Sequence, residues 1–187
     1  MKIIILEGIA TSGKTSIIKY LSAFFDQKNF KFSIISEDKT LMPILHNQDK
    51  QVSIELLKLV IKQALTDDKE FIIFDRLFFT HIFRTNSDYS NFREIEQMIK
   101  DYTILAFLKI DEDQIPTRIE YARQHRDKSW NEYISQKGND EEIYQYYIQQ
   151  QRTLENLLNQ TNLNYKAYNT TNLQFEEITQ DLVKIIF

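Results

Sequence analysis

Several residue types are scarce or absent in this chain of 187 residues, which has no cysteine, three glycines and two prolines. Without cysteine, a disulfide framework and a thiolate metal site are both excluded. The three histidines are scattered and do not favour a histidine-based metal site. No apolar run approaches the ~20 residues of a membrane-spanning helix, and the first run is too short for a signal peptide. We therefore expect a cytoplasmic protein that does not interact with a membrane.

The charge of the chain is low and evenly spread. Its formal net charge is −4, and the sequence contains no block of like charges. A surface for a nucleic acid polymer is therefore not indicated, and a partner that carries phosphate must be met by local positive charge. With 42% apolar and 13% aromatic residues, and no linker or internal repeat, residues 1–187 are expected to form a single domain.

Short apolar runs alternate with longer segments of helical spacing. The runs predict strands at residues 2–6, 32–36, 71–75, 103–110 and, weakly, 164–168. The other segments predict helices at residues 14–25, 52–65, 93–100, 114–123 and 140–159, a short one from residue 78 and a last one ending near 186. Thr171 and Gln174 match a capping box for the last helix, and the polar stretch 124–139 is expected to be mobile. This alternation predicts an α/β fold, with helices on both faces of a parallel sheet.

Two of the three glycines lie in one stretch, GIATSGKT, which follows the first predicted strand. Gly8, Gly13, Lys14 and Thr15 match the pattern G-x-x-x-x-G-K-[ST], between a strand and a helix as that pattern requires. Glycine lets the backbone turn and approach a phosphate, and the loop amides then converge on the anion at the helix N-terminus. A chance match arises on the order of once per hundred chains of this length. We therefore interpret the stretch as a loop that binds nucleotide phosphates.

Within this loop, Lys14 is expected to reach the β- and γ-phosphates of ATP, and the Thr15 hydroxyl to ligate Mg²⁺. The residues predicted to bind the nucleotide here are Gly8, Ala10, Thr11, Ser12, Gly13, Lys14, Thr15 and Ser16. The base-reading N-K-x-D motif of GTPases is missing, because DEDQ follows the strand TILAFLKI, and no LSGGQ segment indicates a transporter ATPase. A small chain with one such loop is typical of a small-molecule kinase.

Carboxylates stand at the carboxyl ends of two predicted strands. Asp75 ends the strand FIIFD, and Glu37 follows the strand FSIIS. Ligands of open parallel sheets bind at that edge. We therefore expect Asp75 to hold Mg²⁺ or to accept a proton from an attacking hydroxyl, and Arg76 to bind the acceptor or the migrating phosphoryl group. In the alternative, Asp75 and Glu37 cap helices or lie in solvent, and Arg76 lies on the surface.

A cluster of positive charge follows the fourth predicted strand, where Arg118, Arg123 and Arg126 lie within nine residues. Phosphoryl transfer gains mostly from positioned positive charge, and an arginine finger is worth ~10³–10⁵ in rate. We expect Arg123 and Arg126 to be catalytic and Arg118 to bind the nucleotide, within a lid at about residues 118–138. A solvated helix face is the alternative.

Two segments resemble those of known enzymes. FIIFDRLFFTHIF, residues 71–83, resembles the D-R-x-x-x-S/T segment of thymidylate kinases, with Thr80 at the Ser/Thr position, and IPTRIEYARQHR, residues 115–126, resembles their arginine-bearing lid. The resemblance covers nearly the whole chain in the order and spacing of its elements. It implies a three-layer α/β/α P-loop NTPase fold with a five-stranded parallel sheet and a helical lid. In the related deoxynucleoside kinases a Glu after the second strand takes the proton of the sugar hydroxyl, which implies that role for Glu37.

The chain departs from thymidylate kinases at two places. S-E-D at residues 36–38 stands where they carry R-E-P, and K-Q at residues 62–63 stands where they place an Asp-Arg pair against the substrate. Each lost charge-assisted hydrogen bond weakens binding by about ten- to a hundredfold. Thymidylate is therefore not expected to be the best acceptor, unless Lys62 or Arg84 replaces the missing charge. Gln63 could still read the edge of a base.

The sequence thus predicts a kinase that uses ATP and Mg²⁺ and phosphorylates a small-molecule acceptor, a nucleoside or nucleoside monophosphate. A homodimer is a hypothesis for its assembly. Two alternatives remain open at this point, namely a kinase of a non-nucleotide alcohol and a slow nucleotide-binding regulatory protein. A lid with three arginines favours a kinase, because a switch has no need to shield phosphoryl transfer from water. Phe78 and Phe79 could stack a base, although core packing is the commoner role of such a pair.

Overall fold

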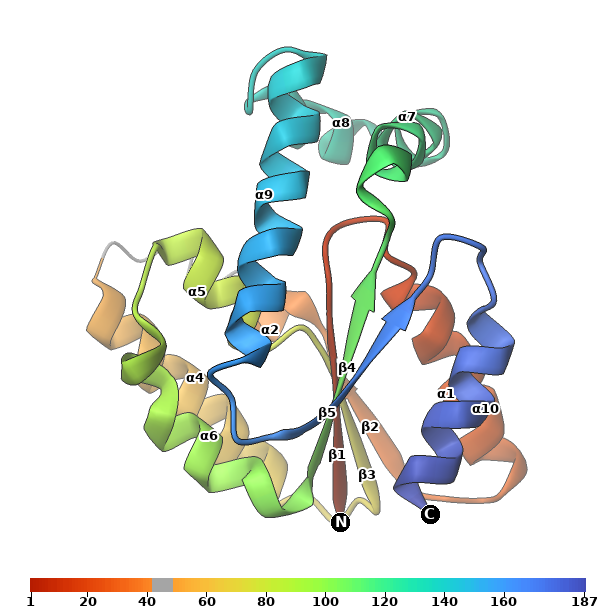
Figure 1. Cartoon of the computed structure of the whole chain (residues 1–187). Coiled ribbons are helices and arrows are strands. Elements are labelled where there is room, and N and C mark those ends of the chain that lie inside the picture. Colours follow the sequence, from red (N-terminus) through yellow and green to blue (C-terminus); the bar gives the residue numbers. More distant parts are fainter. Residues whose placement is uncertain (42–48) are drawn as a thin grey trace.

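The computed structural model describes residues 1–41 and 49–187, and a sheet of five strands forms its centre. The strands are β1 (Lys2–Glu7), β2 (Phe32–Ile35), β3 (Phe71–Asp75), β4 (Thr103–Lys109) and β5 (Asn164–Asn169). All neighbouring strands pair in parallel, in the order β2-β3-β1-β4-β5 (Figure 1). The predicted α/β fold with a five-stranded parallel sheet is confirmed.

The central strands are apolar on both faces because helices cover both sides of the sheet. In β1, Ile3 and Ile5 belong to one apolar core, whereas Ile4 and Leu6 belong to the other, and all four are fully buried. The edge strand β5 exposes five of its six residues, and Tyr168 is the buried one. A strand at an edge needs little apolar sequence, which explains why β5 was the weakest prediction.

The two faces carry different helices. One face is covered by α1 (Lys14–Gln27) and α10 (Phe175–Ile186), and the other by α4 (Lys50–Leu65), α5 (Phe79–Thr85), α6 (Arg93–Ile99) and α9 (Asp140–Leu158) (Figure 1). The short helix α2 (Glu37–Thr40) follows β2, and 3₁₀ turns lie at Tyr89–Phe92, Lys100–Tyr102 and Glu112–Gln114. Among the described residues, no helix combines the length and apolar character that crossing a bilayer requires.

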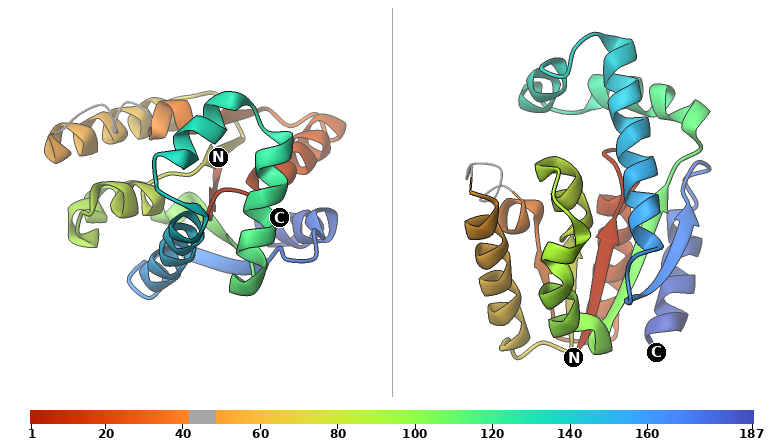
Figure 2. Two further views of the ribbon diagram at one scale, coloured as in Figure 1. Left: turned by 90° about the horizontal axis from the view of Figure 1, so that it is seen from above. Right: turned by 60° about the vertical axis from the view of Figure 1, so that its left-hand side comes forward.

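Two further helices, α7 (Ile115–His125) and α8 (Lys128–Ser135), lie over the carboxyl ends of the strands, as the view from above shows (Figure 2). The polar stretch 124–139 therefore contains a helix that the sequence did not predict. The Asp127 carboxylate accepts a hydrogen bond from the backbone N–H of Trp130 at 2.9 Å and so caps α8. Ile134 is 1% exposed and belongs to a third apolar core, which joins α7, α8 and α9.

The capping box predicted at Thr171 and Gln174 is wrong. α10 begins at Phe175, and the Thr171 hydroxyl accepts instead from the backbone N–H of Asp111 at 2.8 Å. A capping box does open α9, where Asn139 and Glu142 bond reciprocally to each other's backbone N–H groups. The Thr171 hydroxyl thereby connects the loop after β4 to the loop after β5.

Candidate active site

A cavity of about 1170 Å³ lies between the carboxyl edge of the sheet and the lid helices α7 and α8. Loops that follow parallel strands gather at this edge, so residues distant in sequence share one wall. The predicted site residues on the wall are Ala10, Thr11, Gly13, Lys14, Thr15, Ser16, Glu37, Asp75, Arg76, Arg118 and Arg126. Gly8, Ser12 and Arg123 do not line this cavity.

Both glycines of the loop are required by backbone conformation and by packing. Gly8 has a φ of 150° and Gly13 a φ of 92°, which side chains with a Cβ rarely adopt. A Cβ on Gly8 would overlap the carbonyl oxygen of Leu108, and one on Gly13 would overlap the ring of Phe175. The loop therefore packs directly against β4 and α10. Gly13 is also the N-cap of α1, so the positive end of that helix meets the cavity.

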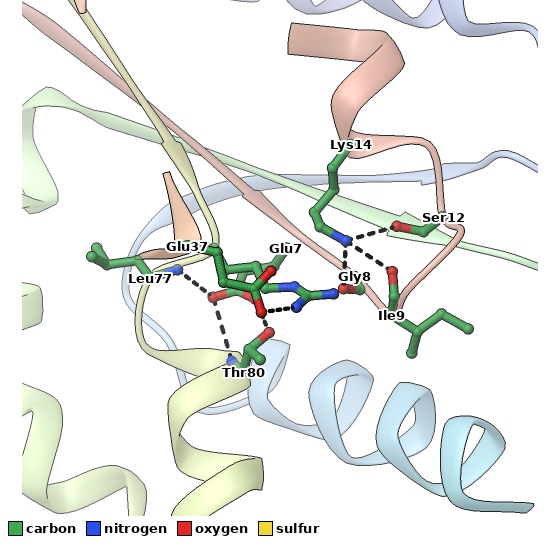
Figure 3. A network of polar contacts seen from close by, with 9 residues as sticks. Glu7, Gly8, Ile9, Ser12, Lys14, Glu37, Leu77 and Thr80 are labelled. Atoms are coloured by element: carbon green, nitrogen blue, oxygen red, sulfur yellow. Dashed lines mark hydrogen bonds and ion pairs between the residues drawn. The ribbon is translucent and has the colours of Figure 1, made fainter. Parts of the chain in front are cut away.

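Lys14 is almost fully buried, and its ammonium group lies within the loop (Figure 3). The Nζ atom donates to the carbonyl oxygens of Gly8 at 3.0 Å and Ile9 at 2.8 Å. Burial, and after it the charge of Arg76, lower the pKa of Lys14 to about 7, although nearby carboxylates, Asp75 first among them, oppose the shift. A bound polyphosphate would supply the negative charge that this cation lacks.

Glu7 is a residue whose role the sequence did not suggest. It ends β1, is fully buried, and accepts hydrogen bonds from the backbone N–H groups of Leu77 at 3.0 Å and Phe79 at 3.1 Å. The Thr80 hydroxyl donates to the same carboxylate at 2.7 Å (Figure 3). Burial raises the pKa of Glu7, and these hydrogen bonds oppose the rise. Glu7 thus caps α5 from β1 and holds the chain that follows Asp75 at the cavity wall.

The structure brings Glu37, Asp75 and Arg76 together. Arg76 has a φ of 66°, donates its backbone N–H to the carbonyl of Leu6 at 3.0 Å, and directs its Nη1 to Glu37 Oε1 at 2.6 Å. Within the described part of the chain, Arg76 Nε and Asp75 Oδ1 are buried without a hydrogen-bond partner. A donor and an acceptor without partners therefore lie next to the ion pair, where a phosphoryl group or a hydrated cation can satisfy them.

The predicted lid arginines occupy different surroundings. Arg118 lines the cavity and donates from Nη2 to the carbonyls of Thr170 at 2.7 Å and Thr171 at 3.0 Å, which fixes its side chain there. Beside it, the stacked rings of Tyr121 and His125, 4.0 Å apart, line the same wall.

Arg126 also lines the cavity, with its guanidinium 4.8 Å from the centre of the Trp130 ring. Arg123, by contrast, is bonded to carboxylates away from the wall, at 2.7 Å to Asp140 and 2.9 Å to Glu120. It connects α7 to the start of α9.

Several residues named from the sequence alone do not reach the cavity. Thr80, Phe78 and Phe79 are fully buried, and the two rings belong to the apolar core beneath α5, so neither stacks a base here. Gln63 and Lys62 lie on the exposed side of α4, because that helix buries other positions such as Leu57 and Ile61. The idea that Gln63 reads a base edge is therefore not supported by its position.

No family model matches this sequence, and no curated protein sequence does. YorR of Bacillus subtilis, solved in complex with phosphorylated GDP, matches with a TM-score of 0.65 and 17% identity, over 99% of this chain and 95% of its own. Shikimate kinase of Bacteroides thetaiotaomicron matches with a TM-score of 0.62 and 21% identity, over 99% of this chain and 98% of its own. Deoxyadenosine kinase of M. mycoides, solved with bound dATP, matches with a TM-score of 0.57 and 15% identity, over 98% of this chain and 100% of its own. The chain therefore shares the fold of these three proteins, two of which are kinases.

The fold also brings to the cavity residues to which the sequence analysis gave no role in a site, apart from naming Arg84 as a possible replacement for a missing charge. They include Arg84 at the end of α5, Tyr133 and Trp130 on α8, Tyr147 on α9, and Asp38 on α2. None of them stands in a motif, and they come from four different helices. Only the folded chain shows that they share a wall with Glu37 and Arg76.

Proposed function

We propose that this protein is a kinase that uses Mg·ATP and transfers the γ-phosphoryl group to a nucleoside or a nucleoside monophosphate. The observation that carries the proposal is the placement of Lys14 and the Glu37–Arg76 pair on the wall of one cavity, together with Arg118 on α7 and Arg126 between α7 and α8. A regulatory nucleotide switch needs the phosphate loop alone. The Glu37–Arg76 pair on the same cavity wall as the loop supports the binding of a second substrate, the acceptor.

ATP is proposed to bind with its phosphates in the glycine loop. The backbone amides from Gly8 to Ser16 and the Lys14 ammonium hold the β- and γ-phosphates, and the start of α1 adds its positive end. The base lies near Arg118, whose side chain is fixed by the carbonyls of Thr170 and Thr171.

The side chains on the wall fit a magnesium ion. Asp75 presents a buried oxygen without a partner among the described residues, and Thr15 is exposed at the start of α1. Oxygen ligands of this kind, completed by water and phosphates, suit Mg²⁺, and no cluster of His, Cys, Asp and Glu in the described residues forms a separate metal cage. When bound there, Mg²⁺ neutralises charge on the β- and γ-phosphates.

The acceptor oxygen is proposed to attack the γ-phosphorus from the side of Glu37 and Arg76. The new oxygen–phosphorus bond forms as the bond to the β,γ-bridging oxygen breaks, and ADP leaves. If the acceptor is a hydroxyl, its proton passes to Glu37 or Asp75, whereas an ionised phosphate oxygen has no proton to lose. Arg76 and Arg126 stabilise the charge on the transferring group. A catalytic role for Arg123 remains a prediction that its ion pairs do not favour.

The first experiment is a thermal-shift panel of nucleosides and monophosphates in the presence of Mg²⁺ and a non-hydrolysable ATP analogue, with Lys14→Ala as the control. A ligand at ~100 times its dissociation constant stabilises the fold by roughly 2.7 kcal/mol. We expect the analogue to stabilise the wild type but not Lys14→Ala, and at least one acceptor to add a further shift. No stabilisation by the analogue at all would contradict the proposal.

A second candidate is a kinase of a non-nucleotide alcohol. It is supported by the match to shikimate kinase, with a TM-score of 0.62 over 99% of this chain. Acceptors of that kind belong in the same panel, and a shift with them alone would favour this candidate. The cytoplasmic location, the homodimer, and the prediction that thymidylate is not the best acceptor stand as predictions beside the proposal.

A further inference from the structure

Arg84 differs from the other arginines of the chain. Of the seven arginines, five donate to an oxygen atom of the described residues, and Arg84 and Arg126 have no such bond within that part of the chain. Arg126 is exposed, whereas Arg84 is partly buried on the last turn of α5 and lines the cavity. Its Nε is buried and has no hydrogen-bond partner among the described residues.

A guanidinium that is partly removed from water and has no anion is unfavourable unless a ligand compensates it. The ring centre of Tyr133 on α8 lies 5.2 Å from the Arg84 guanidinium, and the buried Tyr133 hydroxyl has no hydrogen-bond partner among the described residues. Asp38, on the same cavity wall, is bonded by the Ser36 hydroxyl at 3.1 Å and forms no ion pair with Arg84. Two hydrogen-bond donors on the wall are thus available to a ligand.

The surroundings of Arg84 are positive. Lys137 lies over the rings of Tyr133 and Tyr146, at 4.3 and 4.1 Å from their centres, and has no acidic partner among the described residues. Burial and the charge of Arg84 lower the pKa of Lys137 to about 8. At Tyr147, burial raises the pKa to about 12, and the charges of Arg84, Arg76 and Arg126 all oppose the rise. Arg76, Arg84 and Arg126 all line the same cavity as Tyr147.

We propose that the acceptor already carries an anionic group, a phosphate monoester or a carboxylate, and that Arg84 with the Tyr133 hydroxyl binds it. This inference rests on the proposed function and narrows its acceptor. A guanidinium offers two parallel donors that match either oxyanion, and the aromatic rings behind Arg84 and Lys137 hold the cations in place without neutralising them. A neutral nucleoside would leave Arg84 unpaired.

The test compares Arg84→Met and Arg84→Lys with Arg152→Met, a control in which a surface arginine bonded to Glu112 is replaced. Each protein is assayed at saturating Mg·ATP with three kinds of acceptor. These are nucleosides, their 5′-monophosphates including thymidylate, and shikimate, which carries a carboxylate and no phosphate. Binding of the same acceptors is measured by calorimetry with a non-hydrolysable ATP analogue. Circular dichroism melting confirms that each variant folds.

We expect an anionic acceptor to be the best substrate of the wild type. Arg84→Met should raise the KM and the dissociation constant for that acceptor by about ten- to a hundredfold, with the KM for ATP unchanged. Arg84→Lys should lie between, and Arg152→Met should match the wild type. Preference for monophosphates identifies the anion as phosphate, and preference for shikimate as carboxylate.

Two results would overturn the inference while the proposed function stands, namely a neutral nucleoside as the best acceptor, or an anionic acceptor whose KM is the same in Arg84→Met. The proposed function fails separately if ATP binds and no nucleoside or monophosphate is phosphorylated. In that case phosphorylation of shikimate that depends on Arg84 would still support the anion site.

Discussion

Replacing Lys14 by Met removes a buried cation from the glycine loop, and the structure predicts how the effect on stability varies with pH. Burial lowers the pKa of Lys14 in the folded protein from 10.5 to about 7. Between these values the folded protein has released the proton that the unfolded chain still holds. Unfolding then takes up a proton, so this residue makes the wild type more stable as pH rises from about 7 to about 10.5, and the contribution is lost below about pH 7.

The magnitude follows from the same linkage. The slope is at most about 1.4 kcal/mol per pH unit. The hydrogen bonds from the Lys14 ammonium to the carbonyls of Gly8 and Ile9 favour the charged form, and they therefore reduce the dependence of stability on pH. From pH 7.5 to 9.5 we expect the free energy of unfolding of the wild type to rise by about 1–3 kcal/mol relative to that of Lys14→Met. The carbonyls freed in the variant add a constant penalty, which does not alter this pH dependence.

Urea denaturation of both proteins at pH 6.5, 7.5, 8.5 and 9.5 measures the difference in the free energy of unfolding. Calorimetry of ATP binding at pH 8 in two buffers of different ionisation heat then measures protons taken up, which we expect because phosphate charge restores the proton of Lys14. A stability difference that does not change with pH, together with no proton uptake on ATP binding, would refute this account of Lys14.

Three further predictions concern the rest of the site. Glu37→Gln should lower kcat for a hydroxyl acceptor by about 10²–10⁴ without changing ATP binding; an unchanged kcat in steady-state assays would assign the proton to Asp75. Arg126→Ala should lower kcat more than Arg123→Ala, because only Arg126 lines the cavity, whereas Arg123→Ala should mainly lower the melting temperature; the reverse order would restore the catalytic prediction for Arg123. Hydrogen exchange across residues 124–138 should slow when an ATP analogue and an acceptor are added, and equal rates in both states would argue against a closing lid.

The parts of the fold that the sequence predicted well are those whose patterns are local. The strand at residues 71–75 was placed at its observed bounds, because a run of apolar residues ends there in a carboxylate. The glycine loop was recognised from its sequence pattern. The structure requires both glycines of that pattern, because their φ values and contacts exclude a Cβ. Helix α8 was missed, because its one fully buried side chain, Ile134, stands in a polar stretch and its capping residue, Asp127, was read as part of that stretch.

The parts of the site that could not be predicted depend on the order of the strands. Glu37 and Arg76 were expected at one edge, but their ion pair requires β2 to lie beside β3, which the chain order alone does not tell. Glu7 ends an apolar strand, a signal that could have been noticed, yet its partners on α5 appear only once β1 and β3 are paired. Arg84 was named from the sequence only as a possible replacement for a missing charge, and its surroundings could not be predicted, because they depend on the partner that its side chain lacks in the folded chain.

The central claim is that this cavity transfers a phosphoryl group between two bound small molecules. The most direct measurement uses ATP labelled in its γ-phosphate, incubated with Mg²⁺ and each acceptor of the panel, with products separated and identified by mass spectrometry. The account predicts that label moves to at least one nucleoside or nucleoside monophosphate in the wild type and to none in Lys14→Ala. If the wild type binds ATP but releases the label only as inorganic phosphate, at the same rate with and without every acceptor, the claim is contradicted.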